Sequence, residues 1–183
     1  MLHFPAIPSW DALHPLIIHF PIALLLMVPI FIVVGAAMIP GKGRPYLVAA
    51  MVLLLAGTAA TFVSVGTGEA AARLAERGPG MEQVLENHES LAERTRAAFS
   101  VLSVIFVALL TIPTLAKRAD TRLTTTILPL AFLVLYSVGV LLLVNTAHNG
   151  GRLVHEFGVR AVMAPSAVEA NRALPAETDH DKD

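Results

Sequence analysis

The sequence predicts an all-α integral membrane protein, a four-helix bundle in up-down-up-down order. Hydrophobic residues make up 55% of the 183 residues, and charged residues only 15%. A soluble domain carries about 25% charged residues and does not bury so much apolar surface in a core of this size. The same composition excludes a disordered chain. A net charge of −1, without a basic patch, excludes nucleic acid as a partner.

Four stretches free of Asp, Glu, Lys and Arg predict the transmembrane helices. They are Leu16–Pro40, Leu47–Gly68, Ala97–Leu115 and Leu123–Thr146. A helix needs about 20 apolar residues to cross the hydrocarbon of a bilayer. Strands of a membrane barrel alternate apolar and polar residues over about 10 positions, and these stretches lack that alternation. We therefore assign residues 13–159 to a four-helix transmembrane domain and residues 160–183 to a polar C-terminal tail.

The charges of the connecting segments predict the orientation in the membrane. The first connection contains Lys42 and Arg44 without an acid, and the third contains Lys117, Arg118 and Arg122 against a single acid. Short basic loops stay in the cytoplasm. We therefore expect a multi-pass protein of the bacterial cytoplasmic (inner) membrane, with both termini and the long middle segment outside.

The middle segment between the second and third spans is amphipathic over Ala70–Glu93. Gly78, Pro79 and Gly80 interrupt it, as expected of a helix break. We expect two short amphipathic helices that lie on the outer surface of the membrane. Together with the tail they form a face that we expect to dock another protein.

Five histidines are predicted to converge on the outer side of the membrane. His14 and His19 begin the first span, His88 precedes the third, and His148 and His155 follow the fourth. One histidine at a membrane interface is commonly an amphipathic anchor or a hydrogen-bond donor. Five from three separate helix ends indicate a shared site.

His19 is the histidine that we expect to lie deepest, about 6 Å inside Pro15 at 1.5 Å per residue. An ionisable residue within a span marks a functional site by default. Pro21 lacks an N–H, so it leaves the Ile17 carbonyl without its helical donor and favours a kink. We predict His19 as a metal or haem ligand with His148 as its partner. A second site would pair His88 with His14 or His155. The candidate metal ligands are therefore His19, His148 and His88.

The opening segment resembles a known family. Leu13–Leu24 reads LHPLIIHFPIAL, and His148–His155 reads HNGGRLVH. These motifs are similar to the first and last motifs of a bacterial four-helix membrane family catalogued as domain of unknown function 2231. The resemblance covers roughly residues 13–159. Family members are fused to cytochrome and redox modules, which implies a role in respiratory electron transfer. The departure lies at Phe157–Val159, where many members have His-Gly-Val.

The leading functional hypothesis is a membrane-embedded b-type haem protein that transfers electrons near the outer face of the membrane. Facing helices of four-helix bundles commonly supply two axial imidazoles. Cys is absent, which excludes haem attachment by thioether bonds to this chain. Expected partners are a periplasmic cytochrome or respiratory complex and the quinone pool. The alternatives are a non-haem transition metal site and an accessory or scaffold subunit. Each of these readings favours an electron-transfer or accessory role over a stand-alone enzyme.

Overall fold

The computed structural model describes residues 7–75, 78–117 and 120–160, and this part of the chain is helical without strands. The elements are α1 (His14–Ile17), α2 (His19–Ala37), α3 (Arg44–Leu74), α4 (Met81–Leu115), the π-helical turn η1 (Leu123–Ile127) and α5 (Leu128–His155). Four helical segments are long and apolar enough to cross a membrane, with α1 and α2 forming the first and η1 and α5 the last. The predicted all-α membrane bundle is confirmed.

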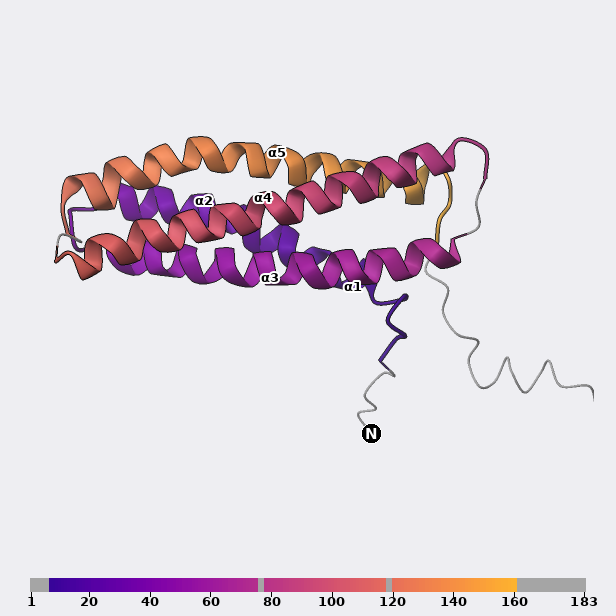
Figure 1. The fold of residues 1–183 in the computed structure, drawn as a ribbon, viewed down its shortest axis with the longest axis horizontal. Coiled ribbons are helices and arrows are strands. Elements are labelled where there is room, and N and C mark those ends of the chain that lie inside the picture. Colours follow the sequence, from indigo (N-terminus) through magenta and orange to yellow (C-terminus); the bar gives the residue numbers. More distant parts are fainter. Residues whose placement is uncertain (1–6, 76–77, 118–119, 161–183) are drawn as a thin grey trace, which may run out of the picture.

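The four long helices run lengthwise beside one another (Figure 1). Helix α2 packs on α3, α3 on α4, α4 on α5, and α5 closes the ring against α2. Helices α2 and α4 therefore face each other across one diagonal, and α3 and α5 across the other. We call the end where α1, the end of α3, the start of α4 and the end of α5 meet the histidine end. The opposite end, with Lys42 and Arg44, is the basic end.

Aromatic and aliphatic side chains fill the middle of the bundle. Phe99, Phe106, Phe132 and Tyr136 contact one another through tilted or edge-on ring pairs and are almost fully buried. The Tyr136 hydroxyl donates to the backbone oxygen of Leu25 at 2.8 Å. This bond satisfies a polar group that would otherwise be unpaired in an apolar core.

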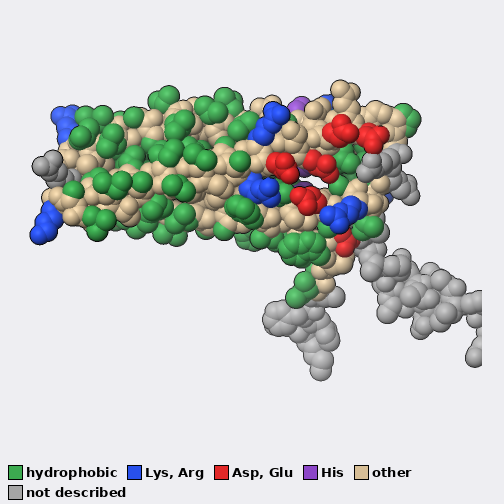
Figure 2. Space-filling model, in the orientation of Figure 1, with side chains coloured by type: hydrophobic (Ala, Val, Ile, Leu, Met, Phe, Trp, Pro, Cys, Tyr) green, Lys and Arg blue, Asp and Glu red, His purple; other side chains and the backbone are tan. Residues whose placement is uncertain are grey.

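The outer surface of the bundle is apolar as well. Val104 and Val134 are 70% and 73% exposed although they lie in the middle of long helices. Hydrophobic side chains cover the length of the bundle, and charged side chains gather toward its ends (Figure 2). An apolar patch of this extent is not found on a soluble monomer. The protein therefore contacts the lipid bilayer.

The middle segment differs from the prediction of two short surface helices. Its residues extend the long helices instead: α3 continues to Leu74, and α4 begins at Met81. The physical reason is a second core cluster at the histidine end, where Ala72, Met81, Val84, Leu85 and Leu153 are buried against one another. This packing stabilises helices that project beyond the charge-free stretches.

The hydrogen-bond pattern of the first span has a gap where the position of Pro21 predicts one, while the backbone at Ile18 stays helical. Helix α1 ends at Ile17 and α2 begins at His19. Pro21 has no N–H to offer the Ile17 carbonyl, which explains the gap at this point. The short helix α1 contacts α3. It is held there by a hydrogen bond of 3.3 Å from the Trp10 indole nitrogen Nε1 to the backbone oxygen of Gly66.

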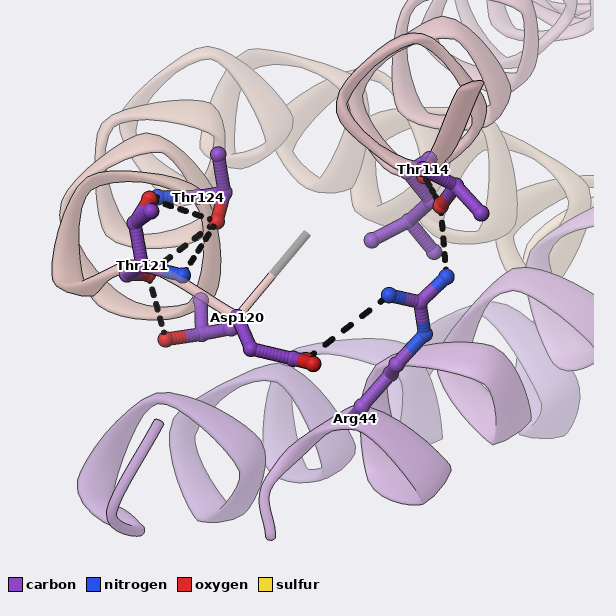
Figure 3. A network of polar contacts seen from close by, with 7 residues as sticks. Arg44, Thr114, Asp120, Thr121 and Thr124 are labelled. Carbon is purple, nitrogen blue, oxygen red and sulfur yellow. Dashed lines mark hydrogen bonds and ion pairs between the residues drawn. The ribbon is translucent and has the colours of Figure 1, made fainter. Parts of the chain in front are cut away.

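Polar contacts fasten the basic end (Figure 3). The Arg44 guanidinium donates to the Thr114 hydroxyl and lies 3.8 Å from the Asp120 carboxylate. The start of α3 is thereby linked to the end of α4 and to the turn before η1. Helices α2 and α3 also approach closely here, because a Cβ added to Gly43 would lie 1.9 Å from the backbone oxygen of Gly35. These contacts and the close packing of α2 on α3 hold the helices together at the basic end.

Candidate functional site

A cavity of about 590 Å³ occupies the histidine end of the bundle. All the long helices contribute to its wall, and Pro21, Ile22 and Leu143 line it on the side of the apolar core. Cofactor sites in proteins are mainly apolar cavities of about 300–1,000 Å³ with a few well-placed polar groups. This cavity fits that description, and its polar groups include the imidazoles of His14, His88 and His155.

His14 reaches the cavity from α1. Its Nδ1 lies 3.0 Å from the backbone oxygen of Ser64 and 3.2 Å from the Thr67 hydroxyl on α3. A carbonyl oxygen only accepts, so Nδ1 is the nitrogen that bears hydrogen. Nε2 of the neutral ring then keeps its lone pair, which is the form that binds a metal.

His88 reaches the cavity from α4 on the opposite side. Its Nδ1 lies 3.0 Å from the backbone oxygen of Thr146 on α5. By the same reasoning Nδ1 donates, and Nε2 keeps its lone pair. The Thr146 hydroxyl lies 2.8 Å from the Thr95 hydroxyl, and this contact joins α4 to α5 beside the ring. The orientation of His88 is therefore fixed by its neighbours.

The two imidazoles lie close together in the cavity. Their ring centres are 6.4 Å apart, and their planes form an angle of 81°. A metal–imidazole bond is about 2.0 Å long and the ring centre lies about 1.1 Å behind Nε2, so two rings on opposite sides of one ion have centres about 6.3 Å apart. The observed spacing matches this arrangement, in which the rings come from diagonally opposed helices.

A glycine makes room for each imidazole. A Cβ on Gly68 would lie 2.9 Å from Cε1 of His14, and a Cβ on Gly150 would lie 3.0 Å from Cε1 of His88. Each glycine comes one helical turn after the carbonyl that holds the ring, Ser64 on α3 and Thr146 on α5. The two halves of the bundle therefore build the same cradle, a carbonyl and a glycine one turn apart.

Comparison with known proteins places the chain in a family. A family described as predicted membrane protein, DUF2231, matches residues 10–163. The chain belongs to the DUF2231 family. The match includes all four spans and the three imidazoles that line the cavity, and it confirms the family resemblance predicted from the sequence. No curated protein and no solved structure matches the chain significantly.

The remaining predicted site residues of this DUF2231 protein lie elsewhere. The side chains of His19 and His148 are exposed and do not line the cavity. His155 lines it but is also exposed. The structure thus brings together His14 and His88, the second pair that the sequence suggested. The pairing of His19 with His148 stays a prediction that this geometry does not favour.

The carbonyls and glycines that hold the two imidazoles were not predicted from the sequence. Ser64 and Thr146 act through their backbone oxygens, so their residue types carry no signal. A single glycine such as Gly68 or Gly150 carries no signal either, because small residues in membrane helices commonly serve close helix packing. The pattern in the sequence that indicates them is a Gly four residues after a Ser or Thr on two different helices, as in Ser64–Gly68 and Thr146–Gly150.

His14 and His88 are the two cavity imidazoles whose Nδ1 bonds to a backbone oxygen. Across residues 7–75, 78–117 and 120–160, no group of three or more His, Cys, Asp or Glu side chains is placed to hold a metal ion. The cavity is also lined by four acids and one base, which are Asp11, Glu69, Glu89, Glu93 and Arg160.

Arg152 forms a 2.9 Å ion pair with Glu156, and its hydrogen bonds lower the pKa of the Glu156 carboxyl.

Proposed function

We propose that this DUF2231 protein binds haem b between His14 and His88 and transfers electrons. The observation that carries the proposal is the pair of opposed imidazoles, each with Nδ1 bonded to a backbone oxygen and Nε2 available. Haem iron in electron-transfer proteins takes two axial protein ligands and no more, because the macrocycle supplies the other four. In the described part of the chain His14 and His88 are not joined by further side chains into a group of three or more metal ligands, which suits that requirement.

The cavity also suits a flat group. Because His14 and His88 come from one diagonal of the bundle, a plane perpendicular to the line between them extends toward α3 and α5. These are the helices on which Gly68 and Gly150 lie, and Gly151 faces open space. Glycine permits the close approach of a cofactor to the backbone. When bound, the haem would supply one-electron redox chemistry, and the chain would orient the imidazoles and exclude lipid and water.

A non-haem metal ion is the alternative that the acids in the cavity wall favour. Structural zinc takes four protein ligands and catalytic zinc three. Glu69 and Glu89 line the same cavity as the two imidazoles, so movement of one carboxylate would complete such a site. The third reading is a scaffold or accessory subunit without a cofactor. Metal and haem analysis of the purified protein separates the three.

The orientation proposed from the sequence places the site near the outer face of the bacterial inner membrane. Lys42 and Arg44 lie at the opposite end of the bundle from the cavity, and basic connections favour the cytoplasm. In this orientation the cofactor lies within reach of a periplasmic cytochrome or another respiratory subunit.

The test is an absorption spectrum of the purified full-length protein, oxidised and then reduced with dithionite, together with metal analysis. We expect a Soret band that shifts on reduction. His14→Ala and His88→Ala are expected to abolish it, whereas His19→Ala and His148→Ala retain it. A band lost only in the last two variants would favour the pairing predicted from sequence. Absence of haem from the wild type, after expression with added haem precursor, would overturn the proposal.

A further inference from the structure

A second hollow lies on the outside of the bundle, between α3 and α4. It is a shallow groove of about 450 Å³ lined by Leu55, Thr58, Ala59, Phe62, Ser100 and Ser103. All six residues belong to the charge-free stretches that cross the membrane. The groove therefore opens toward lipid, and a ligand that enters it comes from the bilayer.

The floor of the groove is polar, which is unusual for a surface that faces hydrocarbon. The hydroxyls of Thr58 and Ser103 lie 2.9 Å apart, and Thr58 is 3.4 Å from the backbone oxygen of Phe99. The longer contact is the weaker one. When Thr58 donates to Ser103, the Ser103 hydrogen is available to an acceptor in the groove.

An aromatic ring and a cation form the outer lip. The Phe62 side chain is 53% exposed, and the Arg96 guanidinium lies over its ring at 5.4 Å from the centre. An exposed ring at this place offers a face for offset stacking with another flat ring. The cation at the lip attracts electron-rich groups and marks the level of the lipid headgroups.

The groove and the histidine cavity share a wall. Thr58 lines the groove and Thr61 lines the cavity. The Thr61 hydroxyl donates to the backbone oxygen of Thr58 at 2.6 Å, so the two sites are separated by less than one helical turn of α3. One turn of helix rises about 5.4 Å. A redox-active molecule in the groove would thus lie close to a cofactor in the cavity.

We infer that the groove binds the head group of a membrane quinone. Such a head is a flat ring with carbonyl acceptors, and its isoprenoid tail remains in the bilayer. The ring would stack near Phe62, and one carbonyl would accept from Ser103. The choice of a redox-active lipid rests on the proposed electron-transfer function. Oxidation of one quinol to quinone would release two protons and two electrons, and the electrons would pass one at a time through the single haem to a one-electron acceptor such as a periplasmic cytochrome.

Photolabelling tests this assignment without requiring haem. The full-length protein in phosphatidylcholine vesicles is labelled with an azido-quinone, and the labelled peptides are mapped by mass spectrometry. We expect label on residues 55–62 and 96–103, with at least a five-fold loss on competition by decylubiquinone. Ala59→Trp, which fills the groove, is expected to abolish the label. Ala56→Trp, an exposed position on the same helix outside the groove, retains it.

Three results would overturn the inference: no label in the groove, label that Ala59→Trp leaves unchanged, or label that anionic phospholipid displaces while decylubiquinone does not. The last result would identify a phospholipid site. The Soret band of the same samples tests the proposed function separately. If haem is present and the groove is not labelled, only the quinone site fails. If the groove is labelled and haem is absent, only the haem proposal fails.

Discussion

At the scale of single residues, hydrogen bonds to Nδ1 decide what the two imidazoles are able to do. Each ring nitrogen that faces the protein bonds to a backbone oxygen, at 3.0 Å in both cases. A backbone oxygen is fixed by its helix, so it holds the ring in one orientation and one tautomer. Groups that hold a metal-binding imidazole in this way raise its basicity and fix its direction.

The glycines beside the rings give a prediction at this scale. Gly68→Ala and Gly150→Ala would each place a Cβ within 3.0 Å of an imidazole, so the ring must move. Loss of an outer contact to a ligand typically lowers affinity about 10- to 100-fold. We expect haem occupancy, measured by pyridine haemochrome, to fall by that order, with normal membrane insertion.

Gly66→Ala is the matched control for the glycine variants. Its added Cβ would lie 3.5 Å from the Trp10 ring, an ordinary contact, so occupancy should match the wild type. Equal occupancy in all three variants would show that the close contacts at Gly68 and Gly150 do not position the ligands.

At the scale of elements, contacts between α1 and α3 position His14. Helix α1 lies against α3, where Trp10 and His14 both bond to backbone oxygens. The backbone at Ile18 is helical, and Pro21 leaves the Ile17 carbonyl without a helical donor. The first span therefore lacks one backbone hydrogen bond close to His14.

Replacement of that proline is the second prediction. Pro21→Ala restores the N–H that the Ile17 carbonyl lacks and favours a continuous helix from α1 into α2. We expect haem occupancy to fall several-fold, while helix content by circular dichroism stays the same or rises. Pro29→Ala, at the other proline inside α2, is the control and should leave occupancy unchanged. Full haem occupancy in Pro21→Ala would show that the backbone hydrogen bond missing at Pro21 does not affect the site.

At the scale of the whole molecule, the bundle has two unlike ends. The histidine end contains the cavity, and the basic end is closed by the contacts of Arg44 with Thr114 and Asp120. The apolar surface between them sets the position in the bilayer. Because the cavity lies at one end only, the direction of insertion determines which side of the membrane the cavity faces.

Reporter fusions test the direction of insertion. With the basic end in the cytoplasm, fusions at Gly43 and Asp120 should have cytoplasmic reporter activity only, and a fusion after Asp183 should be active outside. Alkaline phosphatase and green fluorescent protein give opposite readouts and control for expression. Phosphatase activity at Gly43 or Asp120 would reverse the orientation and place the cavity on the cytoplasmic side.

Most of the fold could be predicted from the charges, and less of the site. The absence of charge over four stretches determines the spans, because charge is costly in hydrocarbon. It does not determine where helices end, since the cluster around Met81 and Leu153 extends α3 and α4 beyond the membrane stretches.

The gathering of histidines at one end was predictable from helix order, but the identity of the facing pair was not. Rotation of a helix about its axis decides whether His14 or His19 faces inward. In an apolar helix that is hydrophobic on all sides, no amphipathic pattern reveals that rotation.

The most direct test of the central claim is the electron paramagnetic resonance spectrum of the purified, oxidised full-length protein. Two imidazoles at 6.4 Å with planes at 81° predict a low-spin ferric haem with the strongly anisotropic signal of nearly perpendicular axial rings. The signal should vanish in both His14→Ala and His88→Ala. A high-spin ferric signal, a copper signal, or no paramagnetic centre would contradict ligation of haem by this pair.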